Sequence, residues 1–177
     1  MDKIRNVPWF VDGAVDFLDK QIQKGTIKKI LEFGSGASTV WFSSRVDVLV
    51  SVEHNKEWHT KISNLITPRT GIDLRLREQP YNTVCEEPLP EKEFDLVVID
   101  GRDRVACTQS ACTFVRAGGF LMLDNSDMKA PWSPAIFDLL ESWKKITWVQ
   151  KGPDQVGYTA PEGIEWETTV FFKGLQE

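Results

Sequence analysis

Two short apolar runs constrain the fold of this 177-residue chain more than any other feature. Residues 94–100 contain the run Leu-Val-Val-Ile, and residues 120–123 form a second run of the same kind. A strand that is apolar at successive positions is buried on both faces, which is typical of a parallel sheet covered by helices. Because strand-like and helix-like segments alternate along the rest of the chain, we expect a three-layer α/β sandwich with a mostly parallel sheet.

Spacing and turn residues place the individual elements. Pro8 suits the first turn of a helix that ends at Gly25, and Asn55 is expected to cap a helix that ends before Pro68. Three prolines between residues 79 and 93 predict a loop. The remaining helices are expected near residues 37–45, 105–115 and 133–143, and the strands at 27–33, 46–53, 72–76, 94–100, 120–123, 146–151 and 166–172.

Charge and hydropathy exclude several classes of protein. Acidic residues outnumber basic residues 26 to 21, so the net charge is −5, and a nucleic-acid partner is not expected. No apolar run approaches the length of about 18 residues that predicts a membrane span. The first residues lack the apolar stretch of a signal peptide, and we therefore expect a cytoplasmic protein with no membrane partner.

The cysteines suggest neither a disulfide framework nor a zinc site. Cys85, Cys107 and Cys112 are an odd set without a CxxC pair. Cys107 and Cys112 fall in an expected helix, where we expect buried, reduced thiols.

The strongest motif follows the first predicted strand, where Glu32 and Phe33 precede Gly34-Ser35-Gly36. Two glycines after a buried strand allow a tight turn and close approach of a ligand to the backbone. A dinucleotide fingerprint would require glycine at Thr39. An acid before the turn would repel a pyrophosphate but suits a ligand with an ammonium and a sulfonium group, so the motif favours S-adenosylmethionine over NAD.

A second acid strengthens this interpretation. Glu53 closes the second predicted strand and lies 17 positions beyond Gly36. An acid at this place can accept hydrogen bonds from both hydroxyls of a ribose. The alternative is an exposed glutamate at the end of a strand.

From Ile27 to Lys173 the chain resembles the class I S-adenosylmethionine-dependent methyltransferases. The resemblance implies a Rossmann-like α/β/α sandwich with a seven-stranded, mostly parallel sheet and an antiparallel last strand, in one domain spanning residues 1–177. It further implies that His54 or Glu78 lies near the adenine and that Glu53 holds the ribose. The methionyl group is implied to lie against Glu32, Gly34, Ser35, Gly36, Ser38 and Thr39, with the reactive sulfur near Asp100. The segments that carry the resemblance are residues 32–36, 52–54, 94–101 and 117–125.

Asp100, Asp124 and Asn125 resemble the magnesium ligands of catechol and caffeoyl-CoA O-methyltransferases. Oxygen ligands at the ends of neighbouring strands suit Mg²⁺, which would lower the pKa of an acceptor hydroxyl and align it with the methyl group. The alternative is that this Asp-Asn pair orders a loop or caps a helix. The residues after Asp100 depart from the pattern of the catechol enzymes.

Arg102, Asp103 and Arg104 are expected at the mouth of the same cleft. The arginines could clamp a carboxylate or phosphate of the acceptor, and Asp103 could instead act as a base. Asp100 is expected to belong to the catalytic centre together with Arg102 and Asp103. The alternative is a helix N-terminus with Asp103 as its cap and with solvated arginines.

These patterns predict methyl transfer to an oxygen or nitrogen of a small-molecule acceptor. Two alternatives stay open: a non-catalytic binding module on the same fold, and an NAD- or nucleotide-binding protein. Trp9 and the N-terminal helix within residues 1–25 are expected to cover the cleft. Acceptor specificity is further expected from residues 79–93, 126–129 and 152–163. The oligomeric state is left open, with a homodimer as one option.

Overall fold

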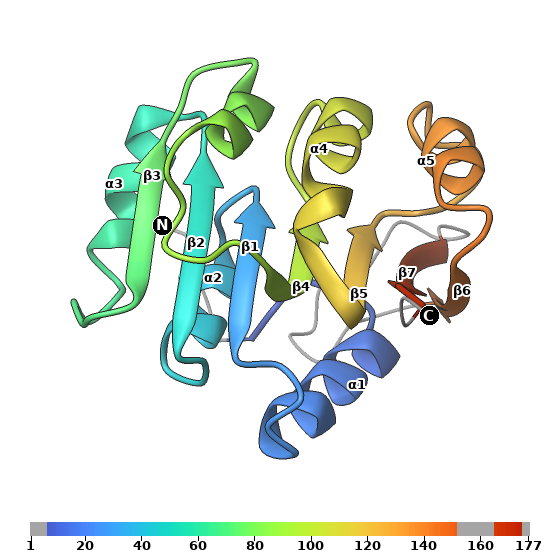
Figure 1. The fold of residues 1–177 in the computed structure, drawn as a ribbon, viewed down its shortest axis with the longest axis horizontal. Coiled ribbons are helices and arrows are strands. Elements are labelled where there is room, and N and C mark those ends of the chain that lie inside the picture. Colours follow the sequence, from blue (N-terminus) through green and yellow to red (C-terminus); the bar gives the residue numbers. More distant parts are fainter. Residues whose placement is uncertain (1–6, 152–164, 175–177) are drawn as a thin grey trace.

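One seven-stranded sheet forms the centre of the molecule, with the strand order β3-β2-β1-β4-β5-β7-β6. The computed structural model describes residues 7–151 and 165–174. Strands β1 to β5 are parallel, and β7 runs antiparallel to both of its neighbours, as predicted (Figure 1). The strands are β1 Lys29–Phe33, β2 Val48–Glu53, β3 Ile72–Leu76, β4 Phe94–Ile99, β5 Val115–Asp124, β6 Lys144–Lys151 and β7 Glu165–Phe172.

Helices cover both faces of the sheet, as the buried strands require. The α-helices are α1 Asp12–Gln23, α2 Ala37–Ser43, α3 Lys56–Ser63, α4 Arg104–Ala111 and α5 Ser133–Leu139. Two 3₁₀ helices are η1 Tyr81–Glu86 and η2 Cys112–Phe114. None of the helices in the described part of the chain is long and apolar enough to cross a membrane.

Local geometry differs from the sequence prediction in a few segments. The stretch 79–93, expected as a loop, contains η1, because Tyr81 and Val84 bury their side chains against the sheet. Helix α4 passes into η2 at Cys112, and Val115 already belongs to β5. All three cysteines are free thiols, but only Cys107 is fully buried.

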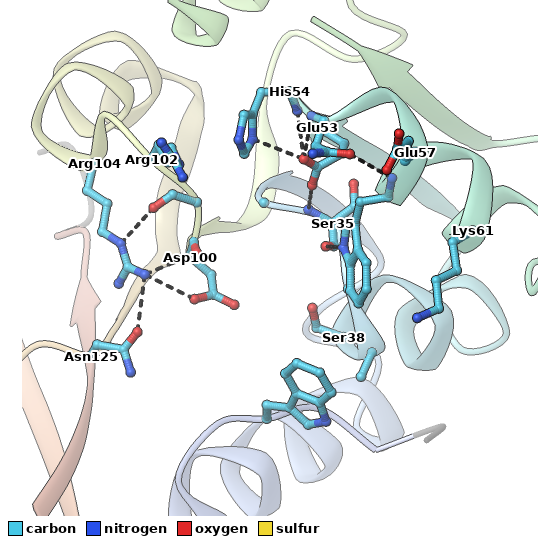
Figure 2. Close-up of a pocket in the computed structure, with 17 residues that line it drawn as sticks. Ser35, Ser38, Glu53, His54, Glu57, Lys61, Asp100, Arg102, Arg104 and Asn125 are labelled. Atoms are coloured by element: carbon cyan, nitrogen blue, oxygen red, sulfur yellow. Dashed lines mark hydrogen bonds and ion pairs between the residues drawn. The ribbon is translucent and has the colours of Figure 1, made fainter. Parts of the chain in front are cut away.

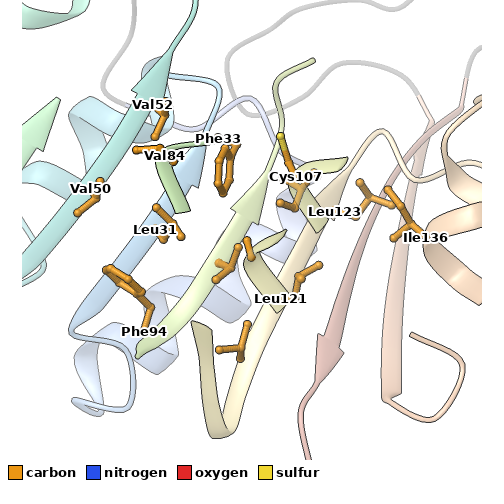
Figure 3. Packing of buried hydrophobic residues seen from close by; sticks show 14 of the residues in the cluster. Leu31, Phe33, Val50, Val52, Val84, Phe94, Cys107, Leu121, Leu123 and Ile136 are labelled. Atoms are coloured by element: carbon orange, nitrogen blue, oxygen red, sulfur yellow. The ribbon is translucent and has the colours of Figure 1, made fainter. Parts of the chain in front are cut away.

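Two hydrophobic clusters hold the layers together. Leu31, Phe33 and Ile99 point to the face covered by η1, α4 and α5, and Figure 3 shows this packing around Cys107. Ile30 and Val98 point to the opposite face, which α1 and α2 cover. This division follows from the two-residue alternation of side chains along each strand.

The same alternation places a row of polar residues on the α1–α2 face. Glu32 lies between Leu31 and Phe33 in β1 and is paired in register with Ser51 of β2. Glu53 lies two residues beyond Ser51 in β2 and therefore points to the same face. Asp124 lies two residues beyond Met122 in β5, and Met122 also points to this face. The apolar core therefore gives way to polar side chains at the carboxyl ends of the strands.

Candidate functional site

A cavity of about 810 Å³ opens at the carboxyl ends of β1, β2 and β4. The strand order reverses between β1 and β4, which is where open α/β sheets bind their ligands. Its volume lies within the range of about 300–1,000 Å³ that is typical of small-molecule sites. The cavity is lined by Trp9, Gly34, Ser35, Gly36, Ala37, Ser38, Glu53, His54, Asn55, Glu57, Trp58, Lys61, Asp100, Gly101, Arg102, Arg104 and Asn125 (Figure 2).

The two glycines of the turn have different roles. Gly34 has a φ of +98°, and a Cβ atom there would lie 2.6 Å from the backbone nitrogen of Gly101. Gly36 has extended backbone, and a Cβ atom there would meet no atom within 4 Å. Gly34 is therefore required by the fold, whereas the missing side chain of Gly36 leaves open space beside the cavity.

Glu32 is buried beneath the glycine turn and does not line the cavity. Its side chain is fully buried and accepts hydrogen bonds from the hydroxyls of Ser38 at 2.5 Å, Thr39 at 2.6 Å and Ser51 at 2.5 Å. Burial raises the pKa of this carboxyl, and the three hydroxyl donors counteract that rise. Glu32 and Thr39, which were predicted to hold the methionyl group, are buried beneath the turn, and of Glu32, Ser38 and Thr39 it is Ser38 that lines the cavity.

Glu53 joins the end of β2 to the glycine turn. One carboxylate oxygen accepts the backbone N–H of Ser35 at 3.2 Å, and the other accepts the N–H groups of His54 and Asn55 at 2.9 and 2.8 Å. The Nδ1 atom of the His54 ring lies 3.0 Å from the second oxygen. Because each carboxylate oxygen has two lone pairs, the oxygen bonded only to Ser35 retains acceptor capacity toward a ligand in the cavity.

The first turns of α3 supply lining residues that the sequence analysis did not identify. Trp58 donates its indole N–H to the backbone oxygen of Ser35 at 2.6 Å and thereby braces the turn. The ammonium of Lys61 lies 4.8 Å from the centre of a Trp58 ring. The i, i+3 spacing of these residues, directly after the second strand, was the available signal.

Asp100 and Asp124 form a pair of carboxyl groups at the ends of β4 and β5. Ile99 and Leu123 are partners in register, so the next residues of both strands are neighbours on the same face. Burial and the adjacent Asp124 charge raise the pKa of Asp100 well above its usual value. Burial also raises the pKa of Asp124 to about 6, although Asp124 accepts the hydroxyl of Thr168 at 2.6 Å.

The guanidinium of Arg104 lies among oxygen atoms at these strand ends. It donates to the backbone oxygens of Asp100 at 3.1 Å, of Gly101 at 2.8 Å and of Asp124. Two side-chain oxygens complete the set, Asp100 Oδ1 at 3.3 Å and Asn125 Oδ1 at 3.1 Å. The arginine side chain is only 9% exposed.

This arrangement does not fit the predicted magnesium site at Asp100, Asp124 and Asn125. The first and last of these residues direct oxygens at Arg104, while Asp124 Oδ1 is bonded to Thr168 and the residue is buried. Among the described residues, no group of three or more histidine, cysteine or acidic side chains could hold a metal ion. A guanidinium occupies the place expected for the metal, and we assign no chemistry to a divalent cation there.

Other predicted residues are separated by the fold. Arg102 is exposed and lines the cavity, as expected, whereas Arg104 is bound to the strand ends and is not free to clamp an acceptor. Asp103 directly precedes α4, has a φ of 51° and is exposed outside the cavity lining, so it is poorly placed as a base. Glu78 is also exposed outside the lining, beyond the end of β3, which leaves His54 as the predicted adenine neighbour.

In the described part of the N-terminal segment, from residue 7 onward, Trp9 is the residue that reaches the cavity. This indole is 50% exposed and lines the cavity. Helix α1 itself buries Ala14, Val15 and Leu18 against the sheet, and none of its residues lines the cavity. Among the described residues, the predicted cover is therefore Trp9, which lies three positions before α1, and not the helix itself.

Comparison with solved structures identifies the fold. An O-methyltransferase from Bacillus cereus in complex with S-adenosylhomocysteine superposes with a TM-score of 0.64 at 17% identity, over 95% of this chain and 85% of that chain. The N-methyltransferase NodS from Bradyrhizobium japonicum, also with S-adenosylhomocysteine, gives 0.66 at 13% identity, over 92% and 86%. A methyltransferase-like protein from Silicibacter pomeroyi gives 0.64 at 17% identity, over 98% and 91%.

These similarities establish that the chain has the Rossmann-like fold of S-adenosylmethionine-dependent methyltransferases. No protein-family model matches the sequence, and no curated protein matches it. At such low identity the likeness concerns the fold, so the chemistry has to be argued from the cavity.

Proposed function

We propose that this protein transfers the methyl group of S-adenosylmethionine to an oxygen or nitrogen atom of a small-molecule acceptor. The observation that carries the proposal is the convergence of Gly36, Glu53 and Asp100 on one cavity at the switch point of the sheet. The Bacillus cereus and Bradyrhizobium japonicum structures named above hold S-adenosylhomocysteine on the same fold, which supports this choice of donor.

The donor is held by the turn and by the end of β2. The open space beside Gly36 lets the methionyl group approach the backbone, and Ser38 offers a hydroxyl there. Glu53 accepts the ribose hydroxyls with its remaining lone pairs, because its backbone bonds already fix the carboxylate in position. His54, beside Glu53, lies toward the adenine.

Methyl transfer needs positioning and a group that takes the acceptor proton. When bound, S-adenosylmethionine supplies an activated methyl group whose carbon–sulfur bond breaks as the acceptor attacks in line. Asp100 is the proposed proton acceptor, since it lines the cavity and its raised pKa makes the carboxylate a stronger base. Holding donor and acceptor about 3 Å apart accounts for much of the acceleration in reactions of this kind.

Arg102 is the proposed contact for an acidic group on the acceptor. Its side chain is exposed at the cavity, and neither a hydrogen bond nor an ion pair engages its guanidinium within the described residues. A planar guanidinium can bind a carboxylate or phosphate with two parallel hydrogen bonds. Residues 79–93 and 126–129 stay proposed contributors to acceptor specificity, whereas residues 152–163 lie outside the described part of the chain.

Calorimetric titration with S-adenosylhomocysteine and with NAD tests the donor assignment. We expect saturable binding of S-adenosylhomocysteine that Glu53→Ala weakens strongly, and no binding of NAD. NAD binding alone would favour the nucleotide-binding alternative. A folded protein that binds neither ligand would refute the proposal and favour the non-catalytic module.

A further inference from the structure

We infer that Arg104 fills a cation site built into the ends of β4 and β5, so that the proposed methyl transfer uses no divalent ion there. The inference rests on the proposed function for its catalytic consequence, but the cation site itself stands on the geometry. Arg104 has no part in the proposed binding of S-adenosylmethionine, which rests on the glycine turn and Glu53.

Five oxygen atoms surround this one guanidinium. They are the backbone oxygens of Asp100, Gly101 and Asp124 and one side-chain oxygen each from Asp100 and Asn125. Carbonyl, carboxylate and amide oxygens are also the ligands that hard divalent cations prefer. The strand ends thus offer a cation-binding set of oxygens, and the chain itself supplies the cation.

Further contacts hold the arginine in this place. Its guanidinium carbon lies 4.6 Å from the centre of a Trp132 ring, and the Trp132 indole donates to the backbone oxygen of Asn125 at 3.2 Å. Asn125 has a φ of 45°, a left-handed conformation that asparagine tolerates better than most residues. The Asp-Asn pair is therefore a turn that faces Arg104, and a divalent ion at the same oxygens would meet a fixed positive charge.

This arrangement narrows the acceptor class. A metal centre can bind two adjacent hydroxyl groups of one acceptor and lower their pKa, whereas a guanidinium that is held at the strand-end oxygens supplies no such coordination. Arg104 therefore acts as a positioning residue that holds Asp100 at the cavity. The acceptor presents a single nucleophilic group to that carboxylate, and its adjacent hydroxyls are not required.

Electron paramagnetic resonance of Mn²⁺ titrated into the whole protein tests the cation site without any acceptor. We expect the wild type to bind no stoichiometric Mn²⁺, with or without S-adenosylhomocysteine. Arg104→Met should bind Mn²⁺ at least about tenfold more tightly than the wild type, because removal of the charge frees the oxygens. Addition of Asp100→Asn to Arg104→Met should abolish this gain, and Arg104→Lys, which keeps the charge, should exclude Mn²⁺ as the wild type does.

Two results would overturn the inference. One is stoichiometric Mn²⁺ binding by the wild type that Asp100→Asn removes. The other is a folded Arg104→Met protein that binds Mn²⁺ no better than the wild type. If Arg104→Met fails to fold, the wild-type and Asp100→Asn titrations decide the matter. Calorimetry of the wild type with S-adenosylhomocysteine tests the proposed function separately. If the wild type does not bind S-adenosylhomocysteine, the proposed function is refuted, and the Mn²⁺ titrations still decide the inference about Arg104.

Discussion

The carboxylate of Glu53 accepts the backbone N–H of Ser35 at 3.2 Å, which ties the end of β2 to the glycine turn that follows β1. The two residues are 18 positions apart in the sequence, yet both line one cavity. A substitution at Glu53 should therefore change the shape of the turn as well as remove a direct ligand contact.

Glu53→Gln should weaken S-adenosylhomocysteine binding by about 10- to 100-fold. Glutamine replaces a charged acceptor with a neutral amide, and hydrogen bonds to a charged group contribute about 1.5–3 kcal/mol. Its amide nitrogen would also face backbone N–H donors. Isothermal titration calorimetry measures the change, and Glu57→Gln, an exposed residue of the same cavity, should stay within about twofold of the wild type. Equal effects of both substitutions would contradict a specific role for Glu53.

Gly36→Ala and Gly34→Ala should separate ligand binding from folding. At Gly36 the added methyl group meets no protein atom within 4 Å, so the melting temperature should stay near that of the wild type while S-adenosylhomocysteine binding falls. At Gly34 the methyl group would collide with the backbone of Gly101, and the φ of Gly34, +98°, is one that alanine rarely adopts. Both effects should lower the free energy of unfolding, by about 2–3 kcal/mol. Unchanged ligand affinity in Gly36→Ala would argue against close approach of the ligand at this residue.

Asp124 should make the protein lose stability as the pH rises. Its pKa is raised to about 6 by burial, from about 3.9 in an unfolded chain. A carboxyl whose folded pKa is raised contributes stability that is complete below about pH 4 and is lost as the pH rises through about 6, a loss of about 3 kcal/mol at most. Urea unfolding of wild type and Asp124→Asn across this range should therefore show the wild type weakening relative to the variant.

Thr168→Val provides a second test of the same carboxyl group. The Thr168 hydroxyl donates to Asp124 and stabilises its charged form, so its removal should extend the loss of stability to higher pH. If the difference in unfolding free energy between wild type and Asp124→Asn stays constant from pH 4 to pH 7, burial does not govern this carboxyl.

Trp9 should report on ligand binding. Its indole is 50% exposed at the cavity, so a bound ligand should cover part of it and change its fluorescence. Trp9→Phe should lose part of this change, because Trp58 also lines the cavity, and should bind S-adenosylhomocysteine several-fold more weakly, while the stability changes by less than about 0.5 kcal/mol. The matched control is Trp143→Phe, because Trp143 packs against the core away from the cavity. A signal that survives in Trp9→Phe and disappears in Trp143→Phe would contradict this placement.

Much of the fold followed from local patterns in the sequence. The apolar runs predicted buried parallel strands, and the glycine turn and Glu53 could be assigned to one edge of the sheet, because the carboxyl ends of parallel strands meet there. Burial on both faces and a tight turn depend mainly on residues that are close in the chain. For that reason β1, β2, β4 and β7 lie close to where the sequence predicted them.

Other features of the site were decided only by the tertiary structure. The sequence pattern predicted a metal site at Asp100, Asp124 and Asn125. In the fold, the side-chain oxygens of these residues instead accept hydrogen bonds from Arg104 and Thr168. Likewise, an acid before a glycine turn predicts a ligand contact. The alternation of side chains along β1 instead buries Glu32 beneath the turn, where it accepts the hydroxyl of Ser51. The sequence determined which polar groups reach the edge of the sheet. Their partners depend on side chains from distant elements, and only packing decides which of these fills each position.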